Sequence, residues 1–207
     1  MRLDLAERLR CPAAHAATPL IVIARTTHAR DLRDGFAGCP VCRLEARVTD
    51  GHVRFGGEAT ARDASGDGPA PELERVIALL GLAEPGGAVL LTGRYASLAA
   101  PLAVETGVAA IVLHAATLPA SSEAVAAVTG ALERVPFGDA AFRGAALDAG
   151  LPAALLADAV RTVMVDGRVV ADARVHAPTG LKELARDDRE WVAARERVGA
   201  VVELRRG

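Results

Sequence analysis

The sequence predicts an α/β protein with a small N-terminal β-ribbon and a larger, mostly parallel sheet with helices on both faces. From residue 71 onward, short continuous apolar runs alternate with segments of helical periodicity, which is typical of strands buried on both faces. Residues 1–57 hold all three cysteines and several turn signals. Residues 58–70 are rich in Gly, Ala, Asp and Pro, without an apolar period. We therefore expect a ribbon module at 1–57, a linker at 58–70 and an α/β domain at 71–207.

Charge and composition argue against several functional classes. The chain has 24 basic and 26 acidic residues, so it carries no strong field for coating nucleic acid. Aromatic residues make up only 3%, which leaves few platforms for stacking single-stranded bases. Residues 1–10 are charged rather than a signal-peptide core, and no uninterrupted apolar run reaches membrane-spanning length. We expect a cytoplasmic protein without a membrane span.

The ribbon elements follow from local patterns. Residues 3–9 have the spacing of a short helix, and residues 19–25 read as an apolar strand. The glycines within 34–38 predict turns. The segment 44–55 predicts a hairpin, because alternating residues flank Asp50-Gly51, a favoured two-residue turn.

The three cysteines predict a zinc site. Cys39 and Cys42 enclose a proline in a Cys-x-x-Cys turn, which aims two sulfurs at one point. Cys11 adds a third ligand, and the position three residues later is Ala14, so His15 is the candidate for the fourth. The predicted set is Cys11, His15, Cys39 and Cys42. The alternative is that the cysteines are small apolar core residues.

These ribbon motifs resemble a known family, the short zinc-ribbon proteins that activate tRNA, rRNA and protein methyltransferases. The resemblance covers about 55 residues and rests on Cys11-Pro12, Pro19-Leu20, residues 39–42 and Asp50-Gly51. The second cysteine of the first knuckle is absent from this chain. The resemblance implies a protein partner such as a methyltransferase, and members of the family occur with and without zinc.

The α/β region has a regular order of predicted elements. The helices are expected at 71–80, 95–105, 121–129, 152–163 and 184–197. The strands are expected at 88–92, 109–113, 132–135, 143–147, 167–171 and 200–204.

This order is similar to that of the class I S-adenosylmethionine-dependent methyltransferases, whose domain is Rossmann-like. The matching segments are GGAVLLTG at 86–93, VPFGDAAF at 135–142 and AVRTVMVDGRVV at 159–170. The resemblance covers residues 70–172 and implies a cofactor site after the first strand of the α/β region, where glycines let backbone amides approach the ligand.

The residues that this cofactor would need are mostly replaced. Only Gly93 remains of the glycine-rich turn, since Tyr95 and Ser97 stand where glycines are expected. Leu91 replaces an acidic residue of the first strand. His114 replaces the carboxylate expected to bind the ribose, and it is otherwise a strand-end residue. We therefore expect no S-adenosylmethionine binding, and we assign no catalytic or cofactor-binding residue.

Four further residues stand at positions where a functional or a structural role can be expected. Arg143 stands where an acidic residue is usual, while Asp139 is kept. Asp148, at the end of a predicted strand, is either a ligand contact or the N-cap of the next helix. The mixed charges of 183–197 indicate an exposed helix face, with Trp191 anchoring that helix to the sheet.

Three functions remain open on these observations. The first is an accessory or scaffold protein, a pseudo-methyltransferase acting through a protein partner. The second is a divergent methyltransferase for RNA or protein, with Tyr95, His114 and Asp139 lining an altered pocket. The third is a structural α/β domain without a ligand.

Overall fold

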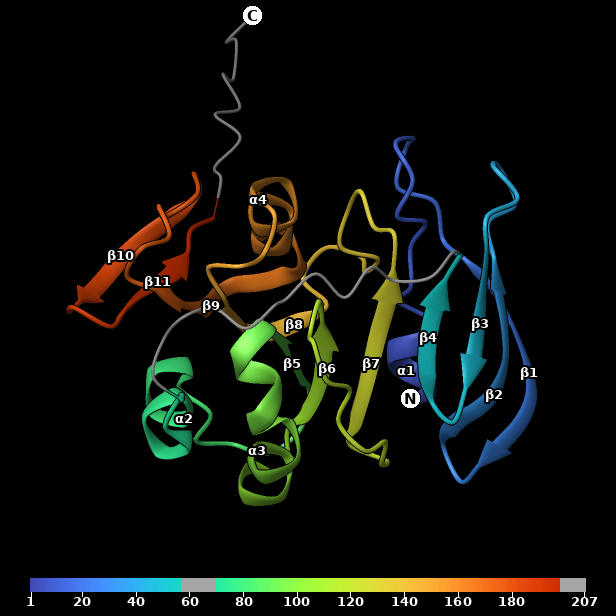
Figure 1. Ribbon diagram of the computed structural model, residues 1–207, viewed down its shortest axis with the longest axis horizontal. Coiled ribbons are helices and arrows are strands. Elements are labelled where there is room, and N and C mark those ends of the chain that lie inside the picture. Colours follow the sequence, from blue (N-terminus) through green and yellow to red (C-terminus); the bar gives the residue numbers. More distant parts are fainter. Residues whose placement is uncertain (57–69, 198–207) are drawn as a thin grey trace, which may run out of the picture.

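The computed structural model describes residues 1–56 and 70–197 (Figure 1). The strand predicted at 200–204 and nearly all of the predicted linker lie outside the described residues. Within them, the strands form one sheet in the order β1-β2-β3-β4-β7-β6-β5-β8-β9-β11-β10.

The N-terminal end of the sheet is antiparallel and carries the short helix α1 (Leu3–Ala6) on one side. Its strands are β1 (Ile21–His28), β2 (Asp31–Gly38), β3 (Glu45–Thr49) and β4 (His52–Phe55). The predicted hairpin at 44–55 is confirmed, and both Asp50 and Gly51 have positive φ, as its tight turn requires. The turns expected at 34–38 were wrong, because these residues belong to β2. A Cβ on Gly35 would lie 2.3 Å from the Ile23 carbonyl oxygen, so this glycine permits close strand pairing.

The ribbon is joined to the α/β region through the sheet itself. Strand β4 pairs in parallel with β7 (Val125–Gly130), placing Val53 opposite Val128 and Phe55 opposite Gly130. A Cβ on Gly130 would lie 2.0 Å from the Phe55 carbonyl oxygen, and its φ is +120°. Glycine is therefore needed where the two parts meet. The division at residue 57 stays a prediction, since both parts share one sheet.

Five central strands run parallel: β7, β6 (Ala109–Leu113), β5 (Ala88–Thr92), β8 (Phe142–Leu147) and β9 (Val163–Asp172). On one face lie α2 (Leu73–Leu80), the 3₁₀ helix η1 (Gly93–Leu98) and α3 (Ala99–Thr106), and they share one apolar core. Helix α4 (Ala153–Thr162) packs on the other face in a second core. The predicted helices at 71–80, 95–105 and 152–163 are confirmed, as are the strands at 88–92, 109–113, 143–147 and 167–171.

Three predicted elements of this region were wrong. The helix expected at 121–129 is replaced by β7, and residues 132–135 form no strand. Alanines gave the segment an apparent helical character, but Val125–Val128 is a fully buried run between β6 and β4. The helix expected at 184–197 is instead an antiparallel hairpin of β10 (Leu181–Arg186) and β11 (Glu190–Arg195). Asp187 closes its turn by accepting the N–H groups of Arg189 and Glu190, each at 2.9 Å.

The sheet as a whole is mixed rather than mostly parallel. Strand β11 lies antiparallel to β9, and the β-ribbon at the other end is antiparallel as well. Trp191 anchors to the sheet as predicted, although from a strand. It is 1% exposed and donates its indole N–H to the Val175 carbonyl at 2.7 Å.

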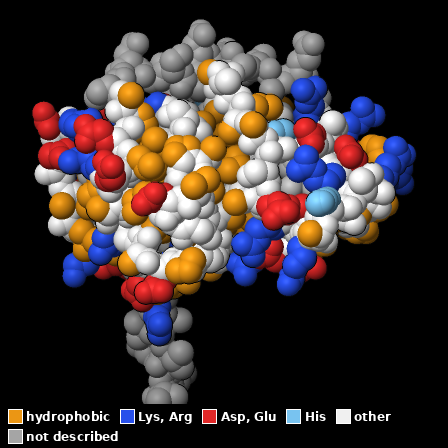
Figure 2. All heavy atoms as spheres, turned by 90° about the horizontal axis from the view of Figure 1, so that it is seen from below, with side chains coloured by type: hydrophobic (Ala, Val, Ile, Leu, Met, Phe, Trp, Pro, Cys, Tyr) orange, Lys and Arg blue, Asp and Glu red, His pale blue; other side chains and the backbone are white. Residues whose placement is uncertain are grey.

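The described part of the chain contains no helix with the length and apolarity needed to cross a membrane. The face seen in Figure 2 carries apolar side chains across its middle and charged side chains toward its two sides. Exposed large apolar residues on the described surface include Val104 of α3, at 87%, and Ile21 and Ile23 of β1, at 57% and 61%.

Candidate functional site

The structure brings Cys11, His15, Cys39 and Cys42 together. One ligand atom from each residue lies within 4.8 Å of the other three. The Cys42 sulfur is 3.5 Å from the Cys11 sulfur and 3.3 Å from His15 Nε2. The Cys39 sulfur is 3.5 Å from the same nitrogen. Two segments 24 residues apart in sequence thus place three thiols and one imidazole around a common point.

Local backbone structure holds these ligands. The N–H of Cys11 donates to the Thr18 carbonyl at 2.9 Å, which closes the first loop. The N–H of Arg43 donates to the Cys39 carbonyl at 3.0 Å, and Arg43 has a φ of +61°, which closes the second. His15 Nδ1 lies 2.8 Å from the Ala16 carbonyl oxygen. That contact puts the proton on Nδ1 and leaves Nε2 with its lone pair toward the sulfurs.

The cysteines differ in their electrostatic surroundings. Burial raises the pKa of Cys11 to about 12. Burial also raises the pKa of Cys39, but the backbone N–H groups of Cys42 and Val41 outweigh it and lower the value to about 6. The Cys-x-x-Cys loop therefore favours one thiolate before any cation is considered.

The donor set and its spacing fit a tetrahedral metal ion such as zinc. Zinc–sulfur bonds of about 2.3 Å and zinc–nitrogen bonds of about 2.0 Å imply ligand separations of roughly 3.5–3.8 Å. The measured contacts of 3.3–3.5 Å are close to these values. With three sulfurs and one imidazole, the four positions of a closed structural site are filled by protein.

A second place of interest is the carboxyl edge of the parallel strands. The chain runs from β5 to β6 and β7 on one side and then crosses to β8 and β9 on the other. Open α/β sheets bind ligands at such a reversal of strand order, here above the ends of β5 and β8. The residues that lie there are Gly93, which follows β5, and Asp148, which follows β8.

Asp148 occupies the space directly over Gly93. A Cβ added to Gly93 would lie 2.4 Å from the Asp148 Cβ and 2.7 Å from Oδ1. The Asp148 N–H donates to Thr92 Oγ1 at 2.8 Å, and Asp148 Oδ1 accepts the Gly150 N–H at 2.8 Å. The prediction of Asp148 as a helix N-cap was wrong, because Pro152 holds that position and Asp148 closes a turn instead.

Around Asp148 lies a buried network of charges. Arg94, with 10% of its side chain exposed, lies 3.6 Å from Asp148, 3.3 Å from Asp172 and 3.6 Å from Glu190. The three carboxylates have at most 5% of their side chains exposed. Arg75 reaches Glu190 from α2 at 2.9 Å.

Tyr95 belongs to the same network, through hydrogen bonds of its hydroxyl group to Arg94 and Glu190. It is fully buried, and its hydroxyl donates to Glu190 Oε1 at 2.7 Å while accepting from Arg94 at 3.1 Å. Burial raises the pKa of the Tyr95 hydroxyl, and the hydrogen bond to Glu190 raises it further. Tyr95 is thus a neutral, fixed part of the core beneath α2 and α3.

The other predicted positions have structural surroundings. Leu91 is fully buried within β5, and Ser97 donates to the Arg94 carbonyl at 2.9 Å. His114 directly follows β6 with a φ of +52°, and its carbonyl accepts the Gly93 N–H at 3.0 Å. Asp139 pairs with Arg161 at 2.8 Å, at the opposite end of the strands from Gly93. It therefore does not meet Tyr95 and His114 in one pocket.

Asp172 and Glu190 were missed from the sequence. Asp172 ends β9, and a strand-end carboxylate at the ligand edge is a signal that the sequence could have offered. Glu190 could not have been found, because its neighbourhood was expected to form an exposed helix.

No protein-family model matches the chain, and no curated protein matches it. Solved structures that share part of its arrangement include three methyltransferases. A protein provisionally named a sarcosine dimethylglycine methyltransferase, from Galdieria sulphuraria, is 14% identical with a TM-score of 0.37, over 48% of this chain and 44% of that one.

A geranyl diphosphate methyltransferase is 14% identical with a TM-score of 0.35, over 48% of this chain and 43% of that one. An S-adenosyl-L-methionine methyltransferase from Silicibacter pomeroyi is 16% identical with a TM-score of 0.37, over 59% and 88%. This chain thus spans less than half the length of the first two proteins.

Proposed function

We propose that this protein is an accessory or scaffold protein, a pseudo-methyltransferase that holds zinc in its N-terminal ribbon and acts through a protein partner. The observation that carries the proposal is the occupation of the crevice above Gly93. A glycine at this turn would serve to let a ligand approach the backbone, but Asp148 lies there, 2.4 Å from where a Cβ would be.

The described residues support a crevice that S-adenosylmethionine does not occupy. Tyr95 is fully buried where a glycine would be expected, and its hydroxyl is engaged by Glu190 at 2.7 Å. Opening the space would separate Arg94 from carboxylates that have at most 5% of their side chains exposed. Breaking a buried ion pair is strongly unfavourable. The network therefore supports a crevice that side chains fill permanently, rather than one that opens to admit a ligand.

Zinc, by contrast, suits the ribbon. Cys11, His15, Cys39 and Cys42 would hold it, and as a closed four-ligand site it would fix the two loops without offering a position to a substrate. Its contribution is structural stabilisation of the ribbon.

The partner surface that we favour is the free edge of the sheet at β1. Among the described residues this strand pairs only with β2, and Ile21 and Ile23 are 57% and 61% exposed. Val41, in the Cys-x-x-Cys loop, is 66% exposed. An unpaired strand edge with apolar side chains is a template for an added strand of another chain. The partner proposed is a methyltransferase, in keeping with the ribbon's resemblance to methyltransferase activators.

Isothermal titration of the purified protein with S-adenosylmethionine tests the first half of the proposal. We expect no binding heat. Micromolar binding would overturn the pseudoenzyme assignment and support a divergent methyltransferase.

Co-purification from the native host tests the second half. A methyltransferase should accompany the wild-type protein and be lost from the double variant Ile21→Lys, Ile23→Lys. Val104→Lys is the control, since it places a lysine on another exposed apolar position, on α3. Equal recovery of the methyltransferase with both variants would rule out β1 as the docking edge. Recovery of none with the wild-type protein would favour a structural domain without a partner.

A further inference from the structure

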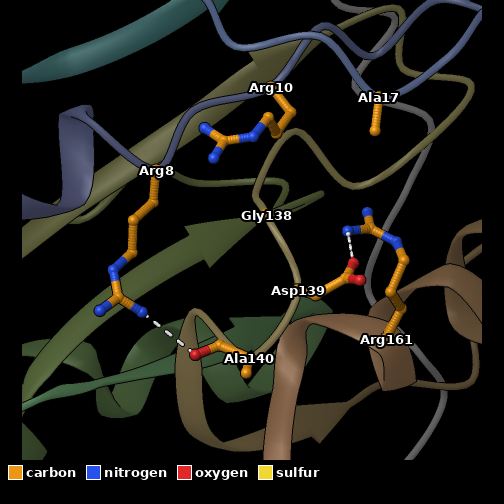
Figure 3. Close-up of a pocket in the computed structure, with 7 residues that line it drawn as sticks. All are labelled: Arg8, Arg10, Ala17, Gly138, Asp139, Ala140 and Arg161. Atoms are coloured by element: carbon orange, nitrogen blue, oxygen red, sulfur yellow. Dashed lines mark hydrogen bonds and ion pairs between the residues drawn. The ribbon is translucent and has the colours of Figure 1, made fainter.

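Figure 3 shows a cavity of about 630 Å³ whose lining includes Arg10 and Ala17, on either side of the candidate metal ligands Cys11 and His15 in the sequence. Arg8 and Arg10 of the N-terminal segment form one side. Residues 138–140, in the loop before β8, form another, and Arg161 in the last turn of α4 forms a third. Its volume is within the range of cavities that hold small ligands.

The cavity is rich in positive charge. Three guanidinium groups line it against one carboxylate, that of Asp139. Arg161 pairs with Asp139 at 2.8 Å, but no carboxylate of the described residues lies within ion-pair distance of Arg8 or Arg10. Within the part of the chain that the structure describes, no neighbouring acid neutralises these two positive charges.

Backbone carbonyls hold these two arginines but use only part of their hydrogen-bonding capacity. Arg8 donates to the Ala140 carbonyl at 3.1 Å. Arg10 donates through one nitrogen to the carbonyls of Glu7 and Leu9, at 3.1 and 3.0 Å. Because a guanidinium has five N–H donors in a rigid fork, each retains donors for a ligand.

The third arginine is fixed more firmly. Arg161 donates to the Phe137 carbonyl at 2.8 Å and to the Val135 carbonyl at 3.1 Å. It also pairs with Asp158 at 2.9 Å. These contacts set the position of the loop that carries Asp139, so this wall is formed before any ligand arrives.

We propose that this cavity binds the phosphate group of a small molecule, as a free mono- or diphosphate or as a phosphate ester. Two unneutralised guanidiniums match the charge of a phosphate, and their planar forks suit its oxygens. Nucleic acid is a poorer match, because the chain has a net charge of −2 and few aromatic residues for stacking. The concave wall also suits a compact anion better than an extended backbone.

The cavity is separate from the site that the sheet topology provides, since residues 138–140 precede β8 whereas Asp148 follows it. It shares one segment with the metal ligands. Arg10 and Ala17 line the cavity, and Cys11 and His15 between them point to the cysteine cluster. The loop that the ligand would contact is therefore shaped by the metal ligands.

Titration calorimetry of the full chain with inorganic pyrophosphate, inorganic phosphate and adenosine diphosphate tests the proposal, with citrate as an anion lacking phosphorus. We expect saturable binding of at least one phosphate probe and weaker binding of citrate. Preference for pyrophosphate over the nucleotide would indicate a free phosphate ligand, and the reverse would indicate a phosphate ester.

Variants make the test specific to the cavity. Arg8→Ala should weaken the binding of the best probe roughly tenfold, because it removes charged hydrogen bonds. Arg54→Ala, an exposed arginine on β4, removes the same charge elsewhere and should leave affinity unchanged. Asp139→Asn should tighten binding several-fold, a gain that damage to the fold does not produce.

Three outcomes would overturn the proposal. The first is no saturable binding of any phosphate probe. The second is an equal effect of Arg8→Ala and Arg54→Ala. The third is binding of a single-stranded RNA oligonucleotide without binding of the small probes.

Discussion

Replacing Arg94 with methionine tests whether the crevice at the carboxyl edge is truly filled. Arg94 lies within 3.3–3.6 Å of three carboxylates that have at most 5% of their side chains exposed. In the variant, Arg75 would still neutralise Glu190 and Arg174 would still neutralise Asp172. Asp148, 1% exposed, would lose the one ion pair that it makes among the described residues.

The expected cost follows from that single buried charge. Removing one partner of a buried pair destabilises proteins by about 3–5 kcal/mol. For a chain of 207 residues, this corresponds to a fall in Tm of roughly 6–20 °C. Urea unfolding followed by circular dichroism at pH 7 measures the loss directly.

Two further variants sharpen the test. Arg174→Met removes a cation that pairs with the same Asp172 at 2.8 Å but is 53% exposed, so it should cost less than about 1 kcal/mol. The double variant Arg94→Met, Asp148→Asn should recover much of the lost stability, because it removes the unpaired charge. If Arg94→Met cost no more than Arg174→Met, the carboxylates would be hydrated, and the inference of a filled crevice would be refuted.

Three other changes test separate parts of the structure. His15→Ala should lower the zinc content of the purified protein, measured by elemental analysis, while His176→Ala should not; full retention of zinc would exclude His15 as an essential ligand. Gly130→Ala should cost roughly 2–5 kcal/mol in urea unfolding, because its Cβ would lie 2.0 Å from a β4 carbonyl oxygen at a φ of +120°, and a neutral result would contradict the observed junction. Burial alone would raise the pKa of Asp158, but hydrogen bonding to the Arg161 guanidinium outweighs it and lowers the pKa. The stability that Asp158 contributes is therefore present above its unfolded pKa near 4, and it is lost as the pH falls through the lower folded value. Asp158→Asn should therefore flatten the loss of stability below about pH 4, and an unchanged pH profile would contradict this assignment.

Local patterns in the sequence predicted the tight turns, the buried parallel strands and the candidate metal ligands. Asp50-Gly51 predicted its hairpin because few residues other than glycine and Asp or Asn accept positive φ at both turn positions. The strands at 88–92 and 109–113 were recognisable because buried parallel strands are apolar throughout. The four candidate metal ligands were also found from sequence, since a Cys-x-x-Cys turn leaves few options for completing the set.

The errors came where tertiary burial outweighs local tendency. Residues 125–128 became a strand because the space between β6 and β4 required one, and an alanine-rich segment satisfies either structure. Residues 190–195 became a strand because β9 offered an unpaired edge. In the sequence, the mixed charges around them resembled a solvated helix face.

The sequence by itself determined which residues are missing from the glycine-rich turn and which could bind a metal ion. Only the tertiary structure decided what fills the space that the missing residues leave. Asp148, Asp172 and Glu190 come from three different strand ends, and Arg94 brings them together at distances of 3.3–3.6 Å. Such a network depends on contacts between residues 54–96 positions apart, and long-range pairing of this kind leaves no local pattern in a single sequence.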